Sequence, residues 1–159
     1  RVLFRSPVSV TANLTNNQFS SVGSVVFRHF RLGASYGAGT TKASNKWSWG
    51  PFVGGNYGRF TGMAEMDFIK NAGIDQMAQF YELDFLPLQG LNTKVTYEYF
   101  DRNMDVANSK DGQQRWTFGV EPFVNRFLQL GLYYRINDFI PQAVEANQDD
   151  IVGRVHVFF

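Results

Sequence analysis

The stretch Leu128-Gln-Leu-Gly-Leu-Tyr-Tyr-Arg-Ile136 alternates between two kinds of side chain with a period of two. Its even positions are leucine, tyrosine and isoleucine, whereas its odd positions are Gln129, Gly131, Tyr133 and Arg135. Successive side chains of a β-strand point to opposite faces, so this order separates an apolar face from a polar one, whereas a helix would mix the two sets. The stretch therefore predicts a β-strand with one apolar face.

The same alternation recurs along most of the chain, and no amphipathic helix of ten residues competes with it. Leu91, Val95 and Tyr97 oppose Lys94 and Glu98 in the same way. We expect about ten strands, and hence an all-β protein. The expected strands are 7–14, 19–26, 30–40, 47–57, 60–68, 76–86, 91–99, 114–122, 128–136 and 151–159.

The connections between these strands alternate in length. Residues 27–29, 58–59, 87–90 and 123–126 form short turns, and the segments between them are mostly longer and polar, at 41–46, 70–75, 101–113 and 137–149. Membrane barrels have short periplasmic turns and longer external loops. The spacing therefore predicts an antiparallel transmembrane β-barrel whose C-terminus lies on the short-turn side.

The composition excludes several other classes of protein. No stretch approaches the roughly 20 apolar residues of a membrane helix, but a barrel dilutes its apolar residues by alternation. The net charge of +1 argues against a nucleic-acid partner. The absence of cysteine excludes disulfides, thiolate metal sites and a cysteine nucleophile. The aromatic content of 16% suits a protein with aromatic girdles.

Charged residues within the expected strands fall on the polar face. A Lys or Arg on the lipid face would cost about 2–4 kcal/mol at the middle of the membrane, whereas a water-filled lumen carries no such penalty. We therefore expect these side chains to line a pore. They are Glu65, Asp67, Glu82, Asp84, Lys94, Glu98, Arg115, Glu121, Arg135 and Arg154.

The order of these charges along the chain predicts how the wall is divided. Glu65 with Glu82, or Asp67 with Asp84, would form carboxylate pairs across neighbouring strands. The arginines lie on later strands, so we expect an acidic stretch followed by a basic stretch. Such an arrangement biases the ion selectivity of a channel.

Aromatic residues of the apolar face gather near the strand ends, where Tyr and Trp suit a membrane interface because one end of the ring system is apolar and the other can stay hydrated. One expected rim contains phenylalanine and the other mostly Trp and Tyr. The phenylalanine rim contains Phe30, Phe60, Phe85 and Phe159. The residues toward the other rim are Trp49, Tyr99, Trp116 and Tyr134.

The ending Val155-His156-Val157-Phe158-Phe159 resembles the C-terminal signature of bacterial outer-membrane barrels. Segments 58–67, 90–101 and 122–135 look like the repeated hairpins of porin-like proteins. The resemblance implies the C-terminal part of a porin-like channel for small solutes or ions in the outer membrane of a Gram-negative bacterium. It also implies that the barrel-assembly machinery reads Val155, Val157 and Phe159, that lipid surrounds the barrel, and that a homo-oligomer is compatible with the family.

The first six residues, Arg1-Val-Leu-Phe-Arg-Ser6, resemble the peptide that a widely used short-read sequencing adaptor encodes in one reading frame. We therefore expect residues 1–6 to be a non-native leader and residues 7–159 to be the barrel segment. This segment would be either the last ten strands of a larger barrel or a complete small barrel with a packed interior.

No motif predicts enzymatic chemistry, so we expect no catalytic residue, cofactor or metal. The two histidines, His29 and His156, fall in a short turn and on the polar face, and no Gly-x-Ser-x-Gly elbow is present. The segment that starts at Asp101 begins like a calcium loop, but Val106 and Gly112 stand where the EF-hand needs Gly and Glu. The paired glycines lack the Lys-Ser/Thr of a phosphate-binding loop.

Four readings of the function stay open beside the channel. The chain could form a sleeve or scaffold around a partner protein, a small non-conducting barrel, a barrel enzyme, or a soluble β-sandwich or lipocalin-like binder. The last of these requires apolar residues to point into a core and charges to point outward. The facing of Leu128, Leu130 and Leu132 separates it from a membrane barrel.

Overall fold

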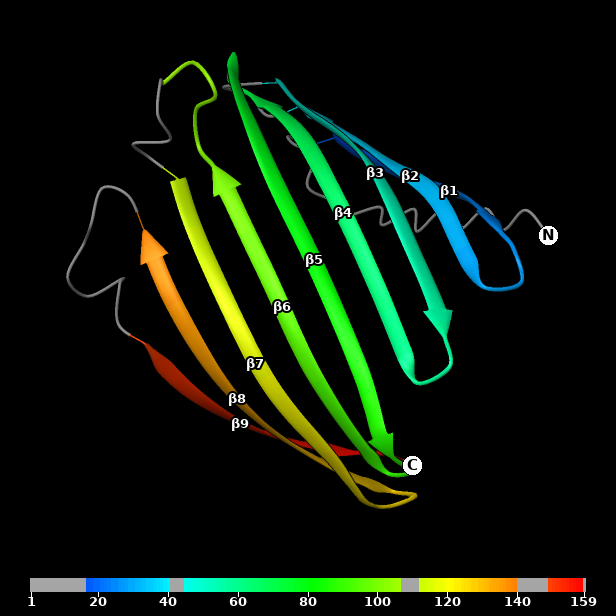
Figure 1. Cartoon of the computed structure of the whole chain (residues 1–159). Coiled ribbons are helices and arrows are strands. Elements are labelled where there is room, and N and C mark those ends of the chain that lie inside the picture. The colour runs from blue at the N-terminus through cyan, green and yellow to red at the C-terminus, as the bar shows by residue number, and fades with distance from the viewer. Residues whose placement is uncertain (1–16, 41–44, 107–111, 140–148, 159) are drawn as a thin grey trace.

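The computed structural model describes residues 17–40, 45–106, 112–139 and 149–158, and their backbone forms one antiparallel sheet in which every strand pairs with its sequence neighbours (Figure 1). The all-β prediction is confirmed, and no helix occurs in the described part of the chain. The predicted strand 7–14 lies outside the described residues. The nine strands are β1 (Asn17–Val26), β2 (Phe30–Thr40), β3 (Asn45–Tyr57), β4 (Phe60–Asn71), β5 (Ile74–Leu88), β6 (Leu91–Asp101), β7 (Gly112–Asn125), β8 (Leu128–Phe139) and β9 (Asp150–Val157).

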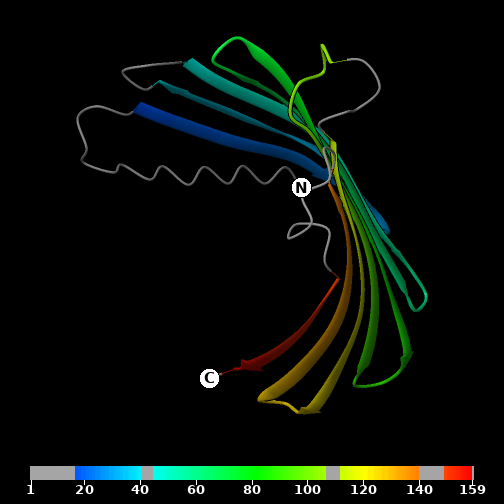
Figure 2. The ribbon, with the colours of Figure 1, turned by 90° about the vertical axis from the view of Figure 1, so that its left-hand side faces the viewer.

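The sheet curves like part of a barrel wall but does not close, because β1 and β9 are not paired with each other (Figure 2). All four short turns, β1–β2, β3–β4, β5–β6 and β7–β8, lie along one edge of this wall. The β4–β5 turn lies along the opposite edge, where β2, β6 and β8 also end, and β9 runs back toward the short-turn edge. Among the described residues, no helix is long and apolar enough to cross a bilayer.

One connection on the loop edge is shorter than the sequence predicts. The expected loop 70–75 is wrong, because β4 continues to Asn71 and β5 begins at Ile74. Ala72 and Gly73 alone make the turn, with φ angles of 53° and 87°. Two successive positive φ values are the geometry that matches a two-residue hairpin turn to the twist of its strands. Hydrophobic periodicity carries no information about such a turn, which explains the difference.

The two faces of the sheet differ in chemistry and in exposure. On β7, Trp116, Phe118 and Val120 are exposed on the convex face, whereas Thr117 and Glu121 are buried on the concave one. Pairing carries this division across the sheet, since residues directly opposite each other share a face. No described element covers the convex side.

The leucines of β8 lie on the exposed convex face, whereas a soluble β-sandwich would bury them in a core. Leu130 and Leu132 are exposed on the convex face, and Leu132 retains 60% of its accessible surface. Tyr133 is the one buried large hydrophobic residue in the described part of the chain, and it lies on the concave face. The described sheet therefore has no apolar core between two layers.

Candidate functional site on the concave face

All ten charged residues that the sequence assigns to a pore lining lie on the concave face. Cross-strand pairing shows this directly, since Asp84 lies opposite Lys94, Lys94 opposite Gly119, and Glu98 opposite Arg115. Directly opposite residues share a face of the sheet, and their Cβ atoms lie about 5 Å apart where both carry a side chain. The concave face therefore gathers the charged residues of β4 to β9, with some apolar residues such as Met63 and Phe80 beside them.

Lys94, in the middle of β6, is the centre of an ion cluster. Its Nζ atom lies 3.2 Å from Oε2 of Glu82, 3.8 Å from Oδ1 of Asp84 and 3.9 Å from Oε1 of Glu121. These acids come from the strands on either side of β6, so one ammonium group links three strands. All four side chains are less than a quarter exposed, which strengthens the attraction relative to an ion pair in bulk water.

Glu121, on β7, is the most heavily bonded member of this cluster. It accepts a 2.6 Å hydrogen bond from the phenol of Tyr133, a 3.1 Å bond from the amide of Asn92 and a 3.4 Å bond from the amide of Gln129. Asn92 also donates to Asp84 at 3.2 Å. The cluster therefore extends from β5 to β8, and each strand within it contributes at least one polar side chain.

The ring of Tyr133 lies across two glycines of the concave face. A Cβ atom at Gly119 would come within 2.6 Å of the ring, and one at Gly131 within 2.7 Å, so only glycine leaves room for the ring. The guanidinium of Arg154, on β9, lies 5.2 Å from the centroid of the Tyr133 ring and forms a cation–π contact with it. The two glycines thus determine where the phenol meets Glu121.

A similar arrangement is found on the other half of the wall. The ring of Phe52 lies over Gly33, where a Cβ atom would come within 2.3 Å of it, and Arg31 lies 5.3 Å from the ring centroid. Arg31 also donates to the hydroxyl of Ser24 at 3.0 Å. The glycines of the concave face thus make room for large rings. These rings fill part of the space that the small residues would otherwise leave empty.

A second group of charges lies nearer the loop edge. Arg115 donates a 2.7 Å hydrogen bond to Asn137 and lies 3.4 Å from Oε2 of Glu98. Arg135 lies 3.9 Å from Oδ1 of Asp150. Both arginines are thus engaged with an acid of a neighbouring strand.

The predicted carboxylate pairs are wrong in register. Glu65 lies opposite Phe80 and Asp67 opposite Ala78, so Asp67 and Asp84 are far apart along the strands. Asp67 instead lies across Gly50, with the hydroxyl of Ser35 at 3.5 Å. The predicted separation into an acidic and a basic stretch is only partial, because Lys94 lies among acids and Glu98 and Arg115 form a mixed pair.

The residues that connect the cluster were not singled out from the sequence. Asn92, Gln129 and Tyr133 fall on the polar face by periodicity, but nothing in the pattern distinguishes them from other polar-face residues. The glycines at 119 and 131 are the available signal, since a glycine inside a strand often marks a close approach by another group. That signal does not say which ring fills the space.

The proposed assembly signal is described in part. Val155 and Val157 are exposed on the convex face of β9, and Phe159 lies outside the described residues. His156 lies on the concave face opposite Gln129. Within the described ranges, no group of three His, Asp or Glu side chains is placed to hold a metal ion.

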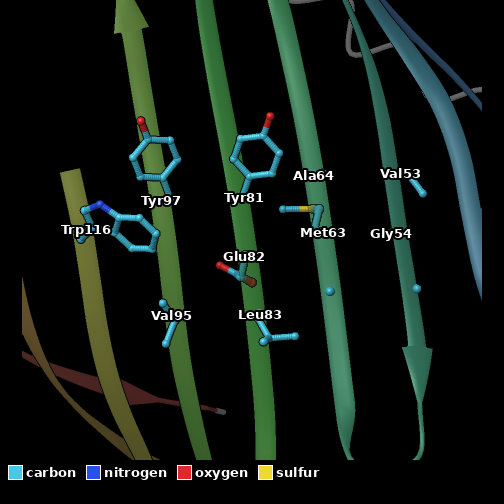
Figure 3. A pocket seen from close by; sticks show the side chains of 12 residues that line it. Val53, Gly54, Met63, Ala64, Tyr81, Glu82, Leu83, Val95, Tyr97 and Trp116 are labelled. Atoms are coloured by element: carbon cyan, nitrogen blue, oxygen red, sulfur yellow. The ribbon is translucent and has the colours of Figure 1, made fainter. Parts of the chain in front are cut away.

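The convex face carries a shallow apolar hollow of about 750 Å³ between β3 and β7 (Figure 3). Its lining includes Gly55 and Gly62. It also includes the rings of Tyr81, Tyr97 and Trp116. The lining is almost entirely apolar, so the hollow offers no chemistry for a polar substrate.

Comparison of the chain with protein-family models, curated proteins and solved structures finds no match.

Proposed function

We propose that this chain forms part of the wall of a bacterial outer-membrane pore, with lipid against its convex face and water with small solutes or ions along its concave face. One observation carries the proposal, namely that large apolar side chains of the convex face are exposed, while most of the charged residues predicted to line the pore lie partly buried on the concave face. Soluble monomers rarely leave a contiguous apolar patch larger than a few hundred Å² open to water.

The dimensions of the apolar band support a bilayer as its partner. On β8 the convex band runs from Leu128 to Ile136, which is about 26 Å along a strand with a rise of about 3.3 Å per residue. A strand tilted by about 40° would then cover about 20 Å of membrane, close to the apolar band of about 25 Å in known barrels. Gln114 and Asp138, joined by a 2.7 Å hydrogen bond, lie just beyond the band on the loop side.

Aromatic rings lie near both borders of the band. Phe60 and Phe85 stack at 4.7 Å near the short turns, and Trp49 and Phe68 stack at 5.0 Å toward the loops. Aromatic belts of this kind occupy the interfaces of membrane barrels. The C-terminal strand, with Val155 and Val157 on its lipid-facing side, would be the part read by the barrel-assembly machinery.

The pore requires that the edges of β1 and β9 be paired, because unpaired backbone groups in lipid cost several kcal/mol each. Further strands in the same sheet would provide this pairing. The lumen would then be lined by the Lys94 cluster and by the pairs around Arg115 and Arg135. The bonded charges give the wall a fixed pattern of potential along the solute path.

Single-cysteine labelling tests which face meets lipid, since the chain has no native cysteine. Nitroxide labels at Leu130, Leu132 and Val155 should be relaxed by oxygen, which concentrates in lipid, once the chain is reconstituted in bilayers. Labels at Gln129, Arg135 and His156 should be relaxed by a water-soluble nickel chelate. If both sets respond to the nickel chelate alone, the convex face does not contact lipid and the proposal fails.

Conductance tests whether the lumen is open. In the closed barrel, replacing Arg115, Arg135 and Arg154 with glutamine should lower the anion-to-cation permeability ratio, and replacing Lys46 and Arg102 should change it less. A sleeve around a partner protein would give no conductance until the partner is removed. An unchanged permeability ratio in a conducting barrel would remove these arginines from the solute path.

A further inference from the structure

The short turns carry a charge pattern that a pore lining does not require. Three of the four contain an arginine, namely Arg28 between β1 and β2, Arg59 between β3 and β4, and Arg126 between β7 and β8. All three side chains are exposed. None of the residues in the four turns is acidic. The turns of the short-turn edge therefore carry basic residues and no acidic ones.

Exposed aromatic rings accompany each arginine. Phe27 and Phe30 stack at 4.3 Å beside Arg28, and Arg126 lies 4.4 Å above the ring of Phe127. Arg59 is flanked in sequence by Tyr57 and Phe60, of which Tyr57 is 84% exposed. Aromatic rings favour the boundary between lipid and water, whereas a guanidinium pairs well with phosphate. The same combination occurs at three turns of one edge.

Among the described residues, Arg59 is the one of these three arginines whose side chain bonds to the backbone. Arg59 donates a 2.5 Å hydrogen bond from Nη1 to the carbonyl of Pro87, which leaves its remaining N–H groups for an external acceptor. No ion pair to an acid is formed by Arg28, Arg59 or Arg126 within the described residues. The positive charge of this edge is thus not neutralised by the described protein.

The opposite edge has the reverse balance. Asp75, Asp101, Asp105, Asp138 and Asp149 lie at or beside the loop-side connections. Three basic residues lie among them, namely Lys46, Arg102 and Lys70, which forms a 3.2 Å ion pair with Asp75, so the described acids still outnumber the bases. The two ends of the wall therefore present opposite charge to whatever lies beyond the apolar band.

We propose that the short-turn edge, defined by Arg28, Arg59 and Arg126 with their neighbouring rings, binds the phosphates of anionic phospholipids in the adjacent leaflet. This inference rests on the proposed membrane location of the convex face. The rings hold the turns at the interface, and the arginines lie where headgroup phosphates begin. A basic residue near an anionic membrane surface contributes about 1 kcal/mol, which corresponds to about a fivefold change in binding.

Spin-labelled lipids measure this preference directly. The chain is reconstituted in phosphatidylcholine bilayers that contain a trace of spin-labelled phosphatidylglycerol or phosphatidylcholine, and the motionally restricted fraction of each is recorded. We expect phosphatidylglycerol to associate several-fold more strongly. Arg28→Gln, Arg59→Gln and Arg126→Gln together should bring the two lipids to equal association. The matched control Lys46→Gln, Lys70→Gln and Arg102→Gln removes the same charge from the loop side and should preserve the preference.

The outcomes separate this inference from the proposed function. If neither lipid is restricted, the convex face has no boundary lipid and the proposed function itself fails. If the unmodified chain restricts both lipids equally, the wall is in the membrane but the arginines do not select the anionic phospholipid. The proposal is then wrong, and the basic edge would have to bind a protein partner instead. Loss of the preference in about 1 M salt would support an electrostatic origin, since screening then acts within about 3 Å.

Discussion

The phenol of Tyr133 donates a 2.6 Å hydrogen bond to Oε1 of Glu121, which lies on the neighbouring strand twelve residues earlier. Both residues are less than a tenth exposed, although they belong to a one-layer sheet. A buried carboxylate needs hydrogen-bond partners to offset its lost hydration. This contact therefore connects the packing of the concave face with its electrostatics.

Tyr133→Phe removes only the phenol oxygen and keeps the ring on Gly119 and Gly131. We expect the free energy of unfolding to fall by about 1–3 kcal/mol, because Glu121 loses its shortest hydrogen bond. Urea unfolding of the chain in detergent micelles measures the change. Tyr81→Phe, whose phenol makes a 3.3 Å bond to Gln79 on the exposed convex face, should change little. Equal losses in the two variants would contradict a special role for Tyr133.

Gly131→Ala places a methyl group where the Tyr133 ring now lies. The ring must move away from Glu121, so we expect a loss of about 1–3 kcal/mol in unfolding free energy. Gly153→Ala is the control, since nothing lies within 4 Å of a Cβ atom there. In a Tyr133→Ala background the Gly131→Ala change should become nearly neutral. Additive losses in that double-mutant cycle would show that the glycine acts independently of the ring.

Lys94→Met leaves Glu82, Asp84 and Glu121 without their shared cation. We expect a loss of about 1–3 kcal/mol, since removing one partner leaves sheltered like charges facing one another. Lys70→Met is the matched control, because the Lys70–Asp75 pair is more than 40% exposed and should contribute less than about 0.5 kcal/mol. Urea midpoints of the two variants give the comparison. A smaller loss at Lys94 than at Lys70 would exclude the cluster as a stabilising feature.

The three tryptophans of the chain provide an intrinsic test of the convex face. Trp47, Trp49 and Trp116 all lie on that face and are exposed. We expect lipids with brominated acyl chains to quench their fluorescence strongly after reconstitution. A chain in which these three are phenylalanine and Phe52 is replaced by tryptophan carries its fluorophore on the concave face. Its emission should respond to aqueous iodide instead, and strong quenching by bromolipid would contradict the assignment of faces.

Much of the local structure could be predicted from the sequence. The alternation around Leu128–Ile136 identifies the strand and its two faces, and the concave position of all ten charged residues follows from the same period. The Ala72-Gly73 turn could not be predicted, because turn chemistry is separate from hydrophobic period. The pairing of Glu65 with Glu82 was also wrong, because Glu65 lies opposite Phe80.

The sequence by itself determined the nine described strands, their faces and the edge on which the short turns lie. Only the tertiary structure decided the register, and with it the contacts of Lys94 with Glu121 and of Glu121 with Tyr133. The physical reason is that a strand slipped by two residues keeps every side chain on its face, so a period-two pattern is satisfied equally well by both registers. The close fit of the Tyr133 ring on Gly119 and Gly131 favours one register over the others, and that fit exists only once β7 and β8 lie side by side.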